Sequence, residues 1–231
     1  MKETKMLNKK ELNNDPQTLN DLIFGSNESK LRVYEIISGA EPLPSSGKSA
    51  ILLYGVYGTG KTTMAKMLPN AIEKGKTNED LVFPEEFIKC QQGFNGPQVT
   101  ILIENIMSRS SLNASGLQYI ILDEVDNLTK QAQQSLKTSL NTNRGIFILT
   151  TNHISELDKG LLDRCVLIEV NAASEMQLLP LAHRIALRMN AEISDNELLP
   201  TIKAANGSFR NLTHNIERLI RRRNVPQNII F

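Results

Sequence analysis

The segment from Gly55 to Thr62 has the residue types and spacing of a loop that binds phosphate groups. It matches the pattern G-x-x-x-x-G-K-[S/T] at every fixed position. Glycines let the backbone turn its N–H groups toward an anion, and the helix expected from Lys61 adds partial positive charge at its start. Lys61 is expected to reach the β- and γ-phosphates of a nucleoside triphosphate, and the Thr62 hydroxyl to hold Mg²⁺. The residues expected to bind the nucleotide are Gly55, Val56, Tyr57, Gly58, Thr59, Gly60, Lys61, Thr62 and Thr63.

Two adjacent carboxylates, Asp123 and Glu124, follow the apolar segment 120–122. At the carboxyl edge of a parallel sheet, Asp123 is expected to orient Mg²⁺, directly or through water. Glu124 is expected to polarise the water that attacks the γ-phosphorus. The alternative is a strand ending in a polar turn, but the phosphate loop earlier in the chain favours the catalytic interpretation.

Two further polar residues follow or precede apolar segments. Asn152, after the segment 145–150, could hydrogen-bond the attacking water or the γ-phosphate, although Thr-Asn is also an ordinary turn sequence. Arg164 precedes the segment 165–170 and, from the residues alone, is equally well a solvated charge.

Composition limits the other classes of site. The net charge of the 231 residues is +1, so only local clusters could favour a nucleic-acid partner. Cys90 and Cys165 form no C-x-x-C motif and indicate a reduced, cytoplasmic setting. The three histidines are scattered, so no metal is expected beyond nucleotide-bound Mg²⁺. No apolar run approaches the ~20 residues of a membrane span, and the polar amino-terminal segment lacks a signal-peptide core.

Apolar segments alternate with helical patterns up to residue 172, which predicts an α/β fold with a parallel sheet covered by helices on both faces. From residue 173 only helical patterns remain, at 174–190, 194–205 and 208–223. We therefore expect a polar arm at 1–15, a nucleotide-binding core at 16–172 and a helical lid at 173–231. The five expected strands are 49–54, 86–91, 118–122, 145–150 and 165–170. The expected core helices are 27–38, 61–73, one from Pro97, 129–141 and 158–163.

Motifs in a fixed order resemble those of the AAA+ ATPases and, within them, the clamp-loader small subunits of the replication factor C type. Thr18–Gly25 is similar to the entry segment of those proteins, and Leu122–Lys137 to their Walker B strand and following helix. Asn152 matches sensor 1, Leu162–Cys165 resembles the arginine-finger motif, and Gly207–Arg210 resembles sensor 2. The resemblance implies a P-loop AAA+ fold with a five-stranded parallel sheet and a helical lid. It also implies that Arg164 reaches the ATP of a neighbouring subunit and that Arg210 assists catalysis from the lid.

The sequence departs from the family pattern at three places. Asn13–Pro16 replaces the segment that contacts adenine in the family, and Asp163 replaces the serine of the finger motif. The sequence given stops after the lid, where those subunits carry a further helical collar, so we expect a subunit lacking the collar. By resemblance, the residue that couples partner binding to Glu124 lies near Cys90–Gln92, with Gln91 as the candidate.

The resemblance also implies partners. Arg109, Lys130 and Lys137 would lie on helices that face a central DNA duplex, and the Arg221–Arg223 run is a second basic cluster or a solvated helix end. We therefore expect an oligomer of AAA+ subunits, identical or different, that uses ATP and Mg²⁺ to load a sliding clamp on DNA. The alternatives are a helicase loader or other DNA-remodelling switch, and a scaffold that binds ATP without hydrolysing it. The expected location is cytoplasmic, or the host cytoplasm or nucleoplasm for a viral protein.

Overall fold

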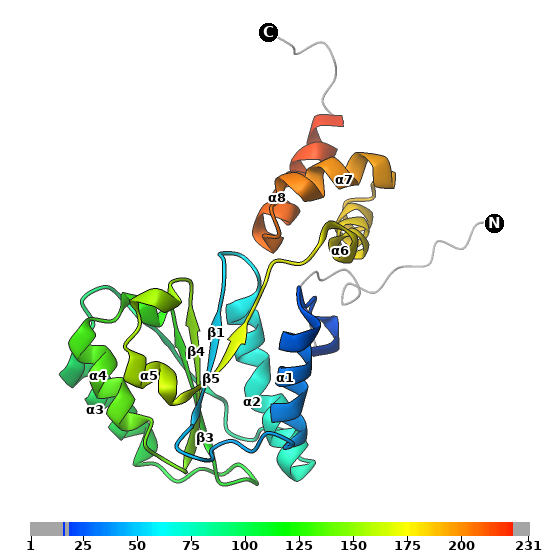
Figure 1. Ribbon diagram of the computed structural model, residues 1–231. Coiled ribbons are helices and arrows are strands. Elements are labelled where there is room, and N and C mark those ends of the chain that lie inside the picture. Colours follow the sequence, from blue (N-terminus) through cyan, green and yellow to red (C-terminus); the bar gives the residue numbers. More distant parts are fainter. Residues whose placement is uncertain (1–15, 17–18, 224–231) are drawn as a thin grey trace. The chain divides into compact units, whose positions relative to one another are not determined.

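The computed structural model describes residue 16 and residues 19–223, which divide into two units (Figure 1). Residues 26–171 form the unit that contains the sheet. Residues 19–25 group with the helical residues 172–223, although the sequence analysis assigned them to the nucleotide-binding core. The predicted arm at 1–15 and the segment Asn13–Asp15 lie outside the described residues.

Within the described residues, five parallel strands form one sheet in the order β2–β3–β4–β1–β5. Four of the strands are largely buried and rich in Ile, Leu and Val, which is typical of a parallel sheet covered on both faces. The prediction of a five-stranded parallel sheet is confirmed. The strands are β1 (Ala50–Tyr54), β2 (Glu86–Lys89), β3 (Gln118–Asp123), β4 (Gly145–Thr151) and β5 (Cys165–Glu169).

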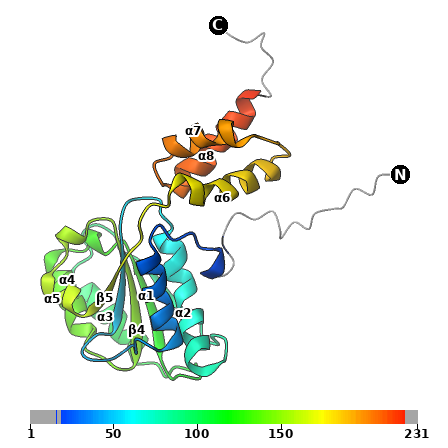
Figure 2. The same ribbon diagram turned by 45° about the vertical axis from the view of Figure 1, so that its right-hand side comes forward.

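Helices cover both faces of this sheet (Figure 1, Figure 2). Leu52, Phe147 and Leu149 belong to the buried cluster on the face of α3, α4 and α5, which also contains Val99 and Leu136 from α3 and α4. The two remaining core helices, α1 and α2, cover the opposite face. The helices are α1 (Asn27–Ser38), α2 (Lys61–Thr77), α3 (Gly96–Met107), α4 (Lys130–Ser139) and α5 (Lys159–Asp163). Short 3₁₀ turns occur at Leu19–Asp21, Val125–Asn127 and Ile154–Glu156.

Most element boundaries differ from the sequence prediction by one or two residues, and three further differences affect residues discussed below. Helix α2 continues past Glu73 to Thr77, and its C-cap is Asn78, which adopts the left-handed conformation and donates its N–H to the carbonyl oxygen of Lys74. Strand β2 ends at Lys89. One further backbone hydrogen bond follows, from the Cys90 N–H to the carbonyl oxygen of Asp123 on β3. Helix α3 ends at Met107, so Arg109 lies beyond it and not on a helix as predicted.

Between residues 172 and 223 the helical unit contains three α-helices, α6 (Glu175–Arg188), α7 (Asp195–Ala204) and α8 (Phe209–Arg223). Its core contains Leu178, Ile185, Leu198, Leu212 and Ile216. Across the part of the chain that the structure describes, none of the helices combines the length and apolar character needed to cross a membrane.

Candidate active site

The phosphate loop joins β1 to α2 and folds around the Lys61 side chain. Lys61 Nζ donates to the carbonyl oxygens of Gly55 at 3.0 Å and of Val56 at 2.6 Å. The residue is 7% exposed. Burial lowers the pKa of the Lys61 ammonium to about 8, and the nearby carboxylates of Asp126 and Asp123 oppose this shift. The lysine is thus held in place by the loop that is expected to bind phosphate.

The backbone of this loop needs its glycines. Gly55, Gly58 and Gly60 have φ angles of 144°, 78° and 87°, which residues with side chains rarely adopt. A Cβ atom on Gly55 would lie 2.6 Å from the carbonyl oxygen of Val170. Gly60 precedes α2 without a side-chain cap, so the first N–H groups of that helix are not used by a capping side chain. This is the local geometry that an anion-binding helix start requires.

Asp123 lies at the end of β3 and is hydrogen-bonded to the start of α2. The Thr62 hydroxyl donates to Asp123 Oδ1 at 2.8 Å, and the Thr150 hydroxyl donates to the same oxygen at 2.7 Å. Asp123 is 6% exposed. A hydroxyl and a carboxylate oxygen are ligands of the type that Mg²⁺ takes beside nucleotide phosphates. The two residues predicted to hold Mg²⁺ are therefore adjacent and chemically suited to it.

Glu124 follows Asp123 in a left-handed backbone conformation, with φ 59° and ψ 54°. Its N–H donates to Thr150 Oγ1 at 2.9 Å. Its side chain is 39% exposed, and Oε2 lies 3.7 Å from the ammonium of Lys89 at the end of β2. Gln91 is exposed, and its side chain makes no hydrogen bond within the described residues. Among the described residues, the Glu124 carboxylate forms its ion pair with Lys89, and the coupling role of Gln91 stays a prediction.

The end of β4 adds polar groups beside the carboxylates. Asn152 is half-buried, and its side chain has no hydrogen-bond partner among the residues described. Thr151, one residue earlier, donates to Asp126 Oδ1 at 2.8 Å. His153 Nε2 and the Tyr57 hydroxyl are hydrogen-bonded, which links this strand end to the phosphate loop.

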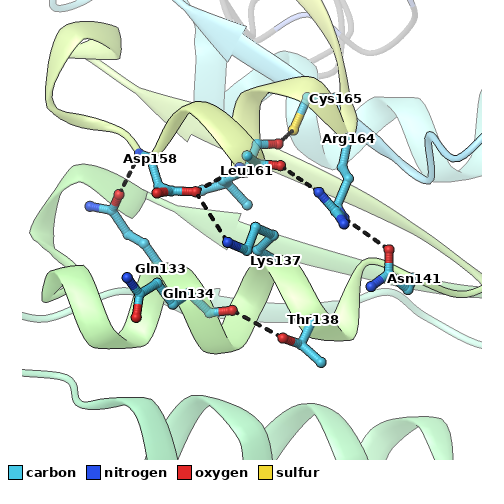
Figure 3. A network of polar contacts seen from close by, with 10 residues as sticks. Gln133, Gln134, Lys137, Thr138, Asn141, Asp158, Leu161, Arg164 and Cys165 are labelled. Atoms are coloured by element: carbon cyan, nitrogen blue, oxygen red, sulfur yellow. Dashed lines mark hydrogen bonds and ion pairs between the residues drawn. The ribbon is translucent and has the colours of Figure 1, made fainter.

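Arg164 lies just before β5, at the amino edge of the sheet. Its Nε donates to Asn141 Oδ1 at 2.9 Å, and its Nη1 donates to the carbonyl oxygen of Gly160 at 2.8 Å (Figure 3). Cys165 pairs with Ala50 in the register of β5 and β1, whereas the phosphate loop follows the other end of β1. The path along β1 from Ala50 to Gly55 is about 16 Å, at ~3.3 Å per residue. Arg164 is therefore remote from the phosphate loop of its own chain.

Polar contacts also join α4 to the segment that carries Arg164 (Figure 3). Gln133 Oε1 accepts from the backbone N–H of Asp158 at 2.8 Å, and Lys137 Nζ lies 3.8 Å from Asp158 Oδ1. Lys130 donates to the carbonyl oxygen of Glu156. The two lysines predicted to contact DNA are thus engaged with residues 156–158. In the described structure the Asp163 carboxylate makes no ion pair with Arg164.

Three of the other cations named in the sequence analysis, Arg109, Arg221 and Arg223, form ion pairs with glutamates. Arg109 forms an ion pair with Glu86 at 3.0 Å. Arg221 pairs with Glu217, and Arg223 pairs with Glu197, so much of the Arg221–Arg223 cluster is neutralised locally. Arg210, on α8 of the helical unit, is exposed and makes no ion pair within the described residues.

A family model matches the part of the chain that contains this site. The family model of the "ATPase family associated with various cellular activities (AAA)" matches residues 51–172, more than half of the chain. This chain belongs to the AAA family. The matched residues include the phosphate loop, both carboxylates and Arg164.

The AAA protein is also similar to replication factor C subunits. It is 26% identical to replication factor C subunit 5 of Mus musculus over 197 residues, 84% of this chain and 55% of that protein. It is 27% identical to replication factor C small subunit 2 of Pyrobaculum islandicum over 192 residues, 82% of this chain and 57% of that protein. The resemblance predicted from the motifs is confirmed as sequence similarity. The AAA protein spans little more than half the length of these curated relatives.

A solved structure shows the same fold. The Thermotoga maritima RuvB Holliday junction branch migration motor superposes with a TM-score of 0.68 at 17% identity, over 90% of this chain and 65% of that one. The prediction of an AAA+ fold is confirmed.

Sequence reasoning missed three contacts of this AAA site. The Thr150 hydroxyl is hydrogen-bonded to the Asp123 carboxylate and to the Glu124 N–H. Lys89 forms an ion pair with Glu124, and His153 is hydrogen-bonded to Tyr57. Each contact joins residues from different strands or loops, so no local motif contains it. The only available signal was that Lys89 and Thr150 lie near the ends of expected strands.

Proposed function

We propose that this AAA protein binds and hydrolyses ATP as a subunit of a clamp-loader-like assembly in DNA replication. The observation that carries the ATPase proposal is the hydrogen bond between Thr62 and Asp123, with Glu124 next in the chain. It joins the phosphate loop to the carboxylate pair in one site. The similarity to replication factor C subunits, over 82–87% of the chain, supports the choice of a clamp-loader-like assembly.

The roles follow from the chemistry of each group. The loop N–H groups and Lys61 bind the phosphates and neutralise their charge. Thr62 and Asp123 would hold Mg²⁺, which supplies charge neutralisation when it is bound. Glu124 accepts a proton from the attacking water, and Asn152, which has no partner among the described residues, is available to orient that water. The exposed Arg210 is proposed to act as the sensor 2 arginine.

We assign Arg164 to the active site of a neighbouring subunit. The ~16 Å length of β1 lies between it and its own phosphate loop, beyond the reach of an arginine side chain. A finger supplied by another chain can contribute roughly 10³–10⁵ in rate. This assignment requires an oligomer with ATP at the contacts between subunits.

Lys89 is proposed to take the coupling role first considered for Gln91. Its ion pair with Glu124 competes with the use of that carboxylate as a base. Lys130 and Lys137, one helical heptad apart on α4, are proposed to contact DNA phosphates. In doing so they exchange their present contacts with residues 156–158.

The test compares the parent with Lys61→Ala and Glu124→Gln. Lys61→Ala is expected to lose ATP binding, because the buried cation is removed. Glu124→Gln is expected to bind ATP and lose turnover by about 10²–10⁴-fold, the usual contribution of a general base. Equilibrium ATP binding and steady-state phosphate release measure the two effects. Equal hydrolysis by Glu124→Gln and the parent would show that Glu124 is not the base.

A second arm addresses the assembly. Primer–template DNA is expected to stimulate the parent's ATPase, and a sliding clamp is expected among the proteins retained by the Glu124→Gln variant from its native host. Retention of a replicative helicase without a clamp would contradict the clamp-loader assignment and leave the ATPase proposal intact.

A further inference from the structure

A threonine near the end of β4 contacts both residues of the carboxylate pair. Thr150 is 2% exposed and pairs with Leu53 of β1 on one side, while β3, which ends at Asp123, lies on its other side. Its place in the sheet therefore puts the hydroxyl between the strand that leads to the phosphate loop and the strand that carries Asp123. None of the motifs of the sequence analysis includes it.

The direction of its hydrogen bonds is fixed by chemistry. The backbone N–H of Glu124 can only donate, so Thr150 Oγ1 accepts this bond at 2.9 Å. A carboxylate oxygen accepts, so the single hydroxyl proton of Thr150 goes to Asp123 Oδ1 at 2.7 Å. Thr62 donates to the same oxygen. One hydroxyl thus links the carboxylate proposed to hold Mg²⁺ to the backbone of the proposed base.

The bond to Glu124 falls at a strained point of the backbone. Glu124 has φ 59°, a conformation that few residues other than glycine adopt. Such a conformation persists where surrounding contacts determine it, and such residues cluster at active sites. The contact that holds the Glu124 N–H comes from Thr150. The direction in which the Glu124 side chain leaves the backbone therefore depends on this hydroxyl.

We infer that Thr150 is a positioning residue for ATP hydrolysis, which holds Glu124 in place and orients Asp123 without touching the nucleotide. This inference rests on the proposed function. The alternative is that Thr150 only fills space in the core. Removal of the hydroxyl at constant volume separates the two, because a packing role is preserved and a positioning role is lost.

The experiment uses Thr150→Val, which replaces the hydroxyl by a methyl group, and Thr150→Ser, which keeps the hydroxyl. Thr150→Val is expected to lower kcat by about 10–100-fold, the usual effect of removing a group that orients a ligand-bearing side chain, with KM for ATP within about threefold of the parent. Thr150→Ser is expected to recover most of the parent kcat. Should Thr150→Val fail to fold, Thr150→Ala takes its place, because it differs from Thr150→Ser only by the hydroxyl.

A double-variant measurement shows whether Thr150 acts through Glu124. In the Glu124→Gln background, Thr150→Val is expected to cause a smaller loss of kcat than in the parent, since the part that acts through Glu124 is already removed and only the part that acts through Asp123 remains. A parent-like kcat in Thr150→Val, or an undiminished loss in the Glu124→Gln background, overturns the inference. If Glu124→Gln itself hydrolyses ATP like the parent, the proposed function fails, and that result is separate from any effect at Thr150.

Discussion

Burial in the phosphate loop shifts the pKa of the Lys61 ammonium toward neutral pH. Burial lowers the pKa of its ammonium from 10.5 to about 8 in the folded protein without nucleotide. Bound phosphates favour the charged form and raise this pKa again. ATP binding is therefore expected to take up close to half a proton at about pH 8 and to approach one proton at about pH 9. The affinity for ATP is expected to fall as the pH rises through 8.

Calorimetry of ATP binding in two buffers with different ionisation enthalpies measures this proton uptake. The Glu124→Gln variant prevents turnover during the titration, and the same variant with Lys61→Arg supplies a cation that does not titrate in this range. Zero proton uptake at about pH 9 by the variant that keeps Lys61 would contradict the account. The sign for stability is also fixed. Because the folded pKa lies below the unfolded one, Lys61 makes folding more favourable as the pH rises from about 8 to 10.5.

Residues of the site divide into those that the sequence could predict and those that it could not. The phosphate loop and Asp123–Glu124 are continuous in sequence, so their spacing alone indicates their chemistry. The partners of these residues come from other strands. Thr150 and Lys89 reach the carboxylates only because β4 and β2 are the neighbours of β3, and no single segment of the sequence contains that order.

At the scale of elements, the end of the edge strand β2 is connected to the proposed base. Lys89 pairs with Asp123 in the register of β2 and β3, which brings its ammonium to 3.7 Å from Glu124. Both side chains are more than a third exposed, and such ion pairs contribute at most about 1 kcal/mol. Lys89→Ala is therefore expected to raise the basal ATPase rate by up to about fivefold and to reduce stimulation by DNA. Steady-state rates with and without primer–template DNA measure both effects.

Two matched variants complete this test. Lys89→Arg keeps the cation and is expected to behave like the parent. Gln91→Ala is expected to have no effect, because the Gln91 side chain makes no hydrogen bond to Glu124 within the described residues. If Gln91→Ala changes the basal rate while Lys89→Ala does not, the coupling residue is Gln91, as the sequence first indicated.

The elements themselves were largely predictable because their burial is periodic or continuous. All five strands and the helices of both units follow from apolar patterns, whereas several of their ends do not. Helix α2 continues beyond Glu73 through residues that are mostly exposed, so no apolar periodicity marks where it ends. The prediction that Arg109 lies on a helix was wrong, because α3 ends at Met107 and the polar residues after it carry no apolar pattern.

At the scale of the whole molecule, the proposed site is incomplete within one chain. The phosphate loop lies at one end of β1, and Arg164 lies beyond the other end, held by Asn141 and Gly160. Hydrolysis is thus expected to require at least two subunits, with ATP between them. Ligand that binds only the assembled form stabilises that form by mass action. Oligomers are therefore expected with ATP in the Glu124→Gln variant and are expected to dissociate with ADP.

A mixing experiment tests this central claim most directly. Arg164→Ala is expected to bind ATP and, alone, to hydrolyse it roughly 10³–10⁵-fold more slowly than the parent, whereas Lys61→Ala fails to bind it. A mixture of the two variants is expected to recover part of the parent activity, because some contacts then join an intact Lys61 from one chain to an intact Arg164 from another. The measurement is the ATPase rate of the mixture and of the parent over a range of protein concentrations. An inactive mixture, together with a parent rate per subunit that does not depend on concentration, would mean that each chain hydrolyses ATP alone.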